Sequence, residues 1–183
     1  MRTRVRPSRP QTAAKWKGSL LACLKDFDFQ PVLTPRLDAL TSRPFTQGVV
    51  DQIVLWKVNR YVDLNLDALE ALNSVSSTKQ GRHRDARPVL ATLMRQKGID
   101  LAMASTLLRF RNKSAFQIID RRAFRAVFGK KYPLRPHSSE NKKIELYFDY
   151  LDRLFALADS KKIDFAILDR VLYVFDKRVN GTL

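Results

Sequence analysis

Apolar residues recur every three or four positions along most of this chain, and that spacing predicts amphipathic helices. The stretch 45–64 is the clearest, because Val50, Ile53 and Val54 belong to a broad apolar face and Thr46 is a suitable N-cap. The same spacing predicts further helices at 13–27, 65–74, 87–96, 101–111, 121–128, about 138–158 and about 164–178. The strand-like run VLYVF lies inside the last of these patterns, so the chain is predicted to be all-α.

The length of 183 residues favours one domain. Residues 1–12 carry arginines and prolines but no acid, which is typical of a disordered basic arm that follows phosphates. Residues 13–183 are expected to form a single compact helical bundle and to remain monomeric. Residues 30–45 contain three prolines and no clean period, so they are expected to be a connector on the surface.

The charge of the chain indicates a binding partner, because the sequence has 34 Lys+Arg but only 18 Asp+Glu, and its net charge is +16. A compact fold needs no such excess, so a polyanion such as DNA is expected. No apolar run approaches the roughly 18 residues of a membrane span, and a cytoplasmic protein is expected, nucleoid-associated if bacterial. Cys23 is the only cysteine, and His83 and His137 are the only histidines, so neither a metal nor another cofactor is expected.

The most patterned region runs from residue 87 to residue 129. RPVLATLMRQ begins with Pro88 near the first helical turn, KGID forms a tight turn, and Asp100 can cap the helix LAMASTLLRFR. RNKSAFQII then leads to Asp120, which precedes the helix RRAFRAVFG that Gly129 can end. A carboxylate fixed between an apolar run and a basic helix needs an explanation in a chain so short of acids.

This order of helix, glycine turn, helix and apolar segment ending in Asp resembles the helix-hairpin-helix superfamily of DNA glycosylases. The resemblance covers residues 93–129, and 45–62 is more weakly similar to the family's central helix. It implies a glycosylase-like all-α fold with a helix-hairpin-helix element at about 87–111. It also implies that the protein binds double-stranded DNA, flips a modified base into a pocket and hydrolyses its N-glycosidic bond.

The resemblance assigns roles to individual residues. Asp120 matches the catalytic acid, which stabilises positive charge on the sugar and orients or deprotonates water. Gly98 and Ile99 match the hairpin, where together with Lys97 they would anchor a phosphate through closely approaching backbone. Four arginines are further candidate nucleic-acid contacts, and the last two are also expected to keep Asp120 ionised: Arg109, Arg111, Arg121 and Arg122.

Departures from the family pattern narrow the expected chemistry. Asp100 stands where the hairpin usually has its second glycine, and its charge would repel a phosphate. Ala102 stands where the lyase members carry a nucleophilic lysine, and the cysteines of the family's iron–sulfur cluster are absent. The resemblance therefore implies a monofunctional glycosylase.

The helical stretch DQIVLWKVNRYVD places polar groups inside an apolar pattern. Lys57 and Arg60 share one face, and a guanidinium at Arg60 can stack on Trp56. One interpretation makes these three residues a wall of the base pocket, where they stack on the base and contact its edge. The other makes them an exposed stripe that pairs with Asp51 or Asp63.

Two alternatives to the enzyme remain open from the sequence. Asp120 has a purely structural interpretation, in which it caps the following helix or pairs with Arg121–Arg125. The rival function is a non-catalytic nucleic-acid-binding helical protein that retains the fold, and Asp100 favours it. A weaker hypothesis is an RNA-associated or partner-binding protein in which the basic arm alone binds.

Overall fold

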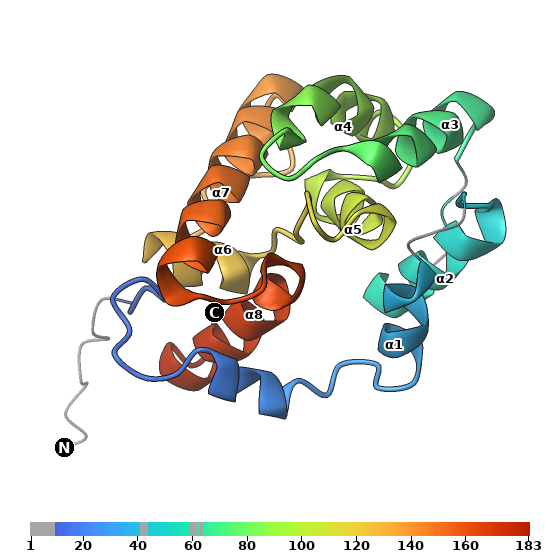
Figure 1. The fold of residues 1–183 in the computed structure, drawn as a ribbon. Helices are drawn as coiled ribbons and strands as arrows, with labels where there is room; N and C mark the ends of the chain where they lie inside the picture. The colour runs from blue at the N-terminus through green and yellow to red at the C-terminus, as the bar shows by residue number, and fades with distance from the viewer. Residues whose placement is uncertain (1–9, 41–43, 59–61, 63) are drawn as a thin grey trace, which may run out of the picture.

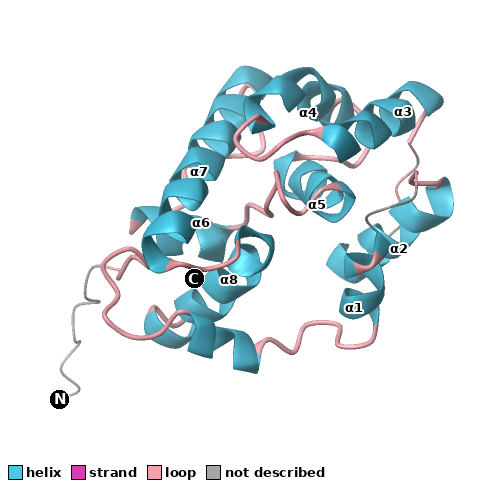
Figure 2. Cartoon of the chain, in the orientation of Figure 1, coloured by secondary structure: helices cyan, strands magenta, loops and turns pink. Residues whose placement is uncertain are grey.

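A computed structural model describes residues 10–40, 44–58, 62 and 64–183. All regular structure in these ranges is helical, as the sequence predicts (Figures 1 and 2). The longer α-helices and their bounds are α2 Gln47–Val58, α3 Leu66–Ser74, α4 Arg87–Met94, α5 Leu101–Arg111, α6 Arg121–Phe128, α7 Glu140–Lys161 and α8 Leu168–Val179. The other helical elements of the described ranges are the short helix α1, Leu33–Asp38, and the 3₁₀ turns η1 Leu21–Asp26, η3 Val75–Ser77, η4 His83–Ala86 and η5 Phe165–Ile167.

Most helix ends lie where the sequence signals placed them. Asn65 caps α3 by accepting a hydrogen bond from the Ala68 amide, and Asp100 caps α5 by accepting one from Leu101. Gly129 ends α6 in the left-handed conformation, with φ of 67°. These ends are predictable because each cap satisfies backbone groups through a residue only one to four positions away.

Two predicted segments differ from the structure. Residues 13–27 do not form one helix; the chain turns at residues 13–15 and becomes helical only in η1. The indole of Trp16 folds over Gly18, where a Cβ atom would lie 2.5 Å from the indole nitrogen. The connector predicted at 30–45 contains α1, which tolerates Pro35 because the first helical turn needs no amide donors there.

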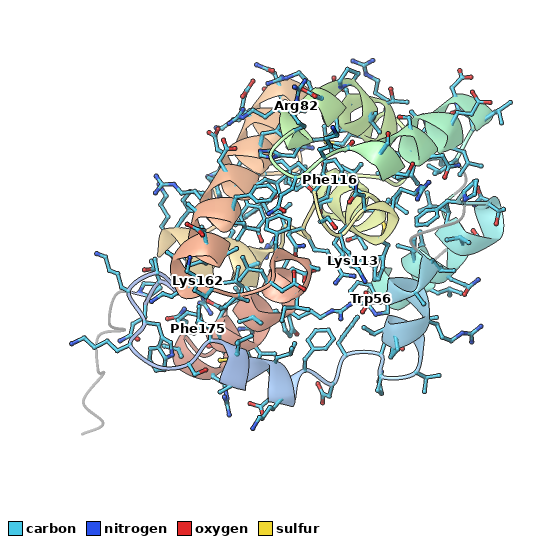
Figure 3. The ribbon with its side chains drawn as sticks, in the orientation of Figure 1. Trp56, Arg82, Lys113, Phe116, Lys162 and Phe175 are labelled. Atoms are coloured by element: carbon cyan, nitrogen blue, oxygen red, sulfur yellow. The ribbon has the colours of Figure 1, made fainter. Side chains whose placement is uncertain are left out.

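The core is built around α5, whose residues are nearly all buried and which packs against α2, α3, α4 and α7. α6 packs against both α7 and α8, and η1 covers another side of α8. Figure 1 shows that α2 and α8 stand apart, and that the loop after η1 runs from η1, next to α8, to α1, next to α2. Phe116 and Phe175, labelled in Figure 3, are fully buried on the two sides of the core.

A charged clasp ties η4 and α4 to α7. Arg84 pairs with Asp149 and Asp152 at 2.9 and 2.5 Å, and Arg87 pairs with Glu145. His83 lies beneath these pairs, where its Nε2 is 2.8 Å from an oxygen of Asp152 and its ring stacks on Phe155.

The predicted basic arm lies mostly outside the described residues. One of its last residues, Gln11, contacts α8's C-terminal end, since its amide donates to Asn180 and its carbonyl accepts a hydrogen bond from Asn180. In the part of the chain that the structure describes, no helix has both the length and the apolar character needed to cross a bilayer.

Candidate functional site

A pocket of about 180 Å³ lies between α2, α8 and the start of α6. Asp120 and Ile118 line it from the segment before α6, and Trp56 and Lys57 line it from α2. Its remaining walls come from α8 and from the segment after η1: Asp169, Arg170, Tyr173, Phe27 and Phe29. The structure therefore brings Asp120 together with two of the three residues predicted to border a base pocket.

Hydrogen bonds from two other helices fix the segment that carries Asp120. The hydroxyl of Tyr147 donates to the carbonyl of Gln117, and that of Tyr150 donates to the carbonyl of Ile118, at 3.0 and 2.9 Å. The amide of Ile119 donates to Ser105 of α5. These bonds are all buried, so the backbone that leads to Asp120 is held before any ligand arrives.

Asp120 itself is half-buried and caps α6. Its Oδ1 accepts a hydrogen bond from the amide of Ala123 at 2.8 Å. The predicted pairing with arginines of the same helix does not form, because Arg122 and Arg125 both pair with the buried Asp176 of α8. Arg121 is exposed. Among the described residues no cation pairs with Asp120, so its second oxygen is available to a ligand in the pocket.

Of the three α2-region residues predicted to form a pocket wall, the structure describes Trp56 and Lys57, which have different environments. Trp56 is nearly buried, donates from its indole to Thr34 at 2.8 Å and packs edge-on against Phe29 and Phe110. It therefore forms the base of the pocket wall rather than an open stacking face. Arg60 and Asp63 lie outside the described residues.

Lys57 lies beside Trp56, with its Nζ 6.0 Å from the indole centroid. Burial lowers the pKa of Lys57, and the charges of Asp120 and Asp169 offset part of this effect. Asp51, one of its predicted partners, instead accepts a hydrogen bond from Gln47. The interpretation as an exposed, paired stripe thus does not describe Lys57.

The more accessible aromatic surfaces belong to residues that were not predicted to border a pocket. Phe29 is 38% exposed, and Tyr173 and Phe27 are half-buried. An apolar cavity of about 150 Å³ is enough to hold benzene, so this mostly apolar pocket has the size of one ring system rather than a whole nucleotide. One feature of the sequence could have pointed to Phe29: it is an aromatic residue that follows the helical pattern of residues 13–27 and does not belong to it.

An ion network supports the α8 side of the pocket. Asp38 of α1 pairs with Arg109 at 2.5 Å and with Arg170 at 2.6 Å, and Arg109 also approaches Asp169 at 3.3 Å. Burial would raise the pKa of Asp38, but the two guanidinium groups hold it below its ordinary value. Nothing in the order of residues signalled this network, because its members lie on three separate helices.

This network corrects a predicted role. Arg109 is 1% exposed, so its guanidinium is structural and out of reach of a DNA phosphate. Arg111 is also buried; it donates to Asn73 and lies over the ring of Phe45. Both residues were expected to contact nucleic acid, and their burial argues against that role.

The predicted hairpin is a tight turn between α4 and α5. Gly98 adopts a φ of 82°, which favours glycine. Lys97 is exposed, but Ile99 is buried and its amide donates to the carbonyl of Gln96. The Ile99 amide already donates within the turn, so it does not point a free N–H group at a phosphate. Asp100 pairs with Lys143 of α7 at 2.7 Å, which offsets its charge at the turn.

Tyr132 is half-buried and packs edge-on against Phe124 of α6. Burial raises the pKa of Tyr132 to about 12, and the charges of Asp100 and Asp120 add to the shift.

Metal ligands do not gather at this site: within the described ranges, no three His, Cys, Asp or Glu side chains cluster as a metal ion requires. Comparisons with models of known families, with curated protein sequences and with solved structures find no match to this chain. The functional argument therefore rests on the residues and on their geometry.

Proposed function

We propose that the protein is a DNA-binding, glycosylase-like enzyme that hydrolyses the N-glycosidic bond of a modified base without a lyase step. The observation that carries the proposal is the pocket, where the Asp120 carboxylate shares a ring-sized, aromatic-walled space with Lys57. The resemblance of residues 93–129 to helix-hairpin-helix glycosylases agrees with this chemistry.

The chemistry follows from what the pocket offers. A base flipped out of the duplex would pack against Phe29 and Tyr173, and Lys57 would donate a hydrogen bond to its edge. When the base leaves with the bonding electron pair, the sugar becomes cationic, and the fixed anion at Asp120 stabilises it. Water then adds to the sugar carbon, and Asp120 orients it or accepts its proton.

Binding to the duplex would use the surplus of positive charge. With Arg109, Arg111 and Arg122 held inside the protein or in ion pairs, the remaining candidate contacts are Lys97 at the turn and Arg121 at the start of α6. The positive end of the α5 dipole lies behind the turn and favours an anion there.

The second candidate function is a non-catalytic nucleic-acid-binding protein of the same fold. Asp100 favours it, because a carboxylate in the turn weakens the grip on phosphate that the enzyme needs. The pairing of Asp100 with Lys143 reduces this objection to the enzyme.

A base-release screen separates the two candidates. Duplexes that each carry one modified base are incubated with the protein, heated in alkali to cleave any abasic sites, and resolved on denaturing gels. We expect strand cleavage with at least one duplex, and only after the alkali step because hydrolysis leaves the backbone intact. Binding to duplexes without base release from any of them would favour the non-catalytic protein.

A further inference from the structure

One side of the pocket is formed by a strap, residues 27–36, that leads from η1 into α1. Phe27 and Phe29 on this strap line the pocket. All residues of the strap are exposed or half-buried except Thr34, which is 5% exposed. Threonine is mostly found on protein surfaces, so a hydroxyl as the one buried side chain of the strap needs an explanation.

The hydroxyl of Thr34 joins α2 to the backbone of the strap. It accepts a hydrogen bond from the indole of Trp56 at 2.8 Å and donates one to the carbonyl of Phe29 at 2.7 Å. Beside this link, the ring of Phe29 packs edge-on against Trp56, with the ring centroids 4.9 Å apart. The amide of Thr34 donates to the carbonyl of Gln30, whose φ of 46° lies in the left-handed region that residues other than glycine rarely adopt. Thr34 therefore holds the strap in a conformation that its backbone does not favour by itself.

We propose that Thr34 is a positioning residue that fixes Phe29 over the pocket and limits the space there to a group of one ring. The pocket of about 180 Å³ is only slightly larger than a cavity of about 150 Å³ that holds benzene. A second fused ring requires Phe29 to move aside. The Thr34 hydroxyl opposes this movement, because it would leave a buried donor without its acceptor.

The consequence for the substrate rests on the proposed function. A pyrimidine has one ring and a purine has two fused rings, so a fixed Phe29 makes the enzyme prefer a modified pyrimidine. Thr34 itself does not line the pocket. It therefore acts on the substrate only through the two side chains that it links, Phe29 and Trp56.

The first test measures the size of the pocket without DNA. The intact protein, labelled with ¹⁵N, is titrated with phenol, which has one ring, and with 2-naphthol, which has two, and binding is followed by NMR. Thr34→Val keeps the shape of the side chain but removes the hydroxyl. We expect it to raise the affinity for 2-naphthol relative to phenol about tenfold, the lower end of the effect of one misfitting group in an apolar pocket. An unchanged ratio would overturn the proposal.

Thr34→Ser restores the hydroxyl, so its affinity ratio should match that of the parent. The indole N–H resonance of Trp56 should follow the same order, displaced in Thr34→Val and restored in Thr34→Ser, while that of Trp16 serves as the internal reference. A displaced Trp56 resonance with a parent-like ratio would reduce Thr34 to a purely structural residue and contradict the proposal.

A second pair of variants leaves the buried hydroxyl intact. Phe29→Ala should raise the 2-naphthol to phenol ratio as Thr34→Val does. Val32→Ala is the matched control, because Val32 is an exposed residue of the same strap and does not line the pocket. A parent-like ratio in Phe29→Ala, or an equal rise in Val32→Ala, would contradict the proposal.

Base release then tests the class of substrate. Values of kcat/KM are compared for duplexes that carry one modified pyrimidine or one modified purine. We expect the parent and Thr34→Ser to prefer the pyrimidine and Thr34→Val to lose about tenfold of that preference. If the 2-naphthol to phenol ratio responds to Thr34→Val but no duplex releases a base, the glycosylase function falls and the positioning role stands. If bases are released with the same preference in Thr34→Val as in the parent, the positioning role falls and the glycosylase function stands.

Discussion

Ion pairs decide which charged side chains remain available to a ligand. Arg122 pairs with Asp176, and Arg109 pairs with Asp38 and Asp169. Among the residues that the structure describes, the side chain of Asp120 has a helix-cap hydrogen bond and no ion pair. The sequence predicts the position of Asp120 because a cap is a local feature. It cannot predict the fate of the arginines, because their partners come from helices distant in the chain.

Replacing Arg109 by alanine tests its structural role. We expect Arg109→Ala to lower the free energy of unfolding by about 3–5 kcal/mol, because the buried Asp169 would lose its arginine partner and Asp38 would keep only Arg170. The exposed Arg121→Ala is the matched control and should change stability by no more than about 0.5 kcal/mol. Urea unfolding followed by circular dichroism measures both. A stable Arg109→Ala variant that had merely lost affinity for DNA would restore the original phosphate-contact interpretation.

At the scale of elements, periodicity and caps predicted most of the helices. α3, α5 and α6 begin and end near their signals because each has a capping residue next to an apolar stripe. The prediction of one helix at 13–27 was wrong. The apolar residues have helical spacing, but Gly18 lies beneath the indole of Trp16, and this contact cannot be read from the spacing. Likewise, the spacing on α2 selected Trp56 and Lys57 but gave no sign of the aromatic loop that completes the pocket.

Two glycines at turns should differ in their sensitivity to alanine. Both Gly98 and Gly129 have positive φ, so alanine at either should cost roughly 1–2 kcal/mol of stability. Alanine at Gly129 should cost about 1 kcal/mol more, because its Cβ would lie 2.9 Å from the methyl of Thr12. Thermal unfolding measures the difference, and the double variant Gly129→Ala, Thr12→Ser should remove it. Equal costs for the two single variants would contradict the packing of residues 10–12 on α6.

The clasp between η4 and α7 should make stability depend on pH. Burial lowers the pKa of His83 below 6.5, and the bond to Asp152 only partly offsets this. Above pH 6.5 the ring is neutral in both states. Below it the unfolded chain binds the proton first, so the folded state loses stability as pH falls toward the folded pKa.

Chemical denaturation at pH values between about 5 and 8 checks this expectation. His83→Gln should flatten the decline in stability within that window. His137→Gln, which changes the other histidine at an exposed position, should leave the decline in place. A decline that follows His137 instead would show that the clasp is not the source.

At the scale of the whole molecule, the pocket exists only because four separated segments meet. α2, the loop after η1, the segment before α6 and the start of α8 each contribute, and the network of Asp38, Arg109 and Asp169 holds α1, α5 and α8 together behind it. The net charge of +16 belongs to the whole chain and is the property that the sequence alone establishes in full. The net charge predicts how the protein binds a DNA duplex, and it does not predict the fold.

Duplex affinity should fall steeply with salt, because Lys and Arg side chains that neutralise phosphates release bound counterions. In a plot of the logarithm of the association constant against that of the salt concentration, Lys97→Ala and Arg121→Ala should each make the slope shallower by about 1. Fluorescence anisotropy with an unmodified duplex measures the slopes. A salt-independent affinity would remove nucleic acid as the partner.

The role of Asp120 is tested most directly by a variant that removes the negative charge but keeps the hydrogen bond that caps α6. Asp120→Asn retains an oxygen that can accept from Ala123, so fold and duplex binding should be unchanged. Asp164→Asn is the matched control, because Asp164 also caps a helical turn but lies outside this pocket. The measurement is single-turnover base release from the best duplex of the screen. We predict a loss of about 10²–10³-fold for Asp120→Asn and none for Asp164→Asn; an Asp120→Asn protein as fast as the parent would contradict the account.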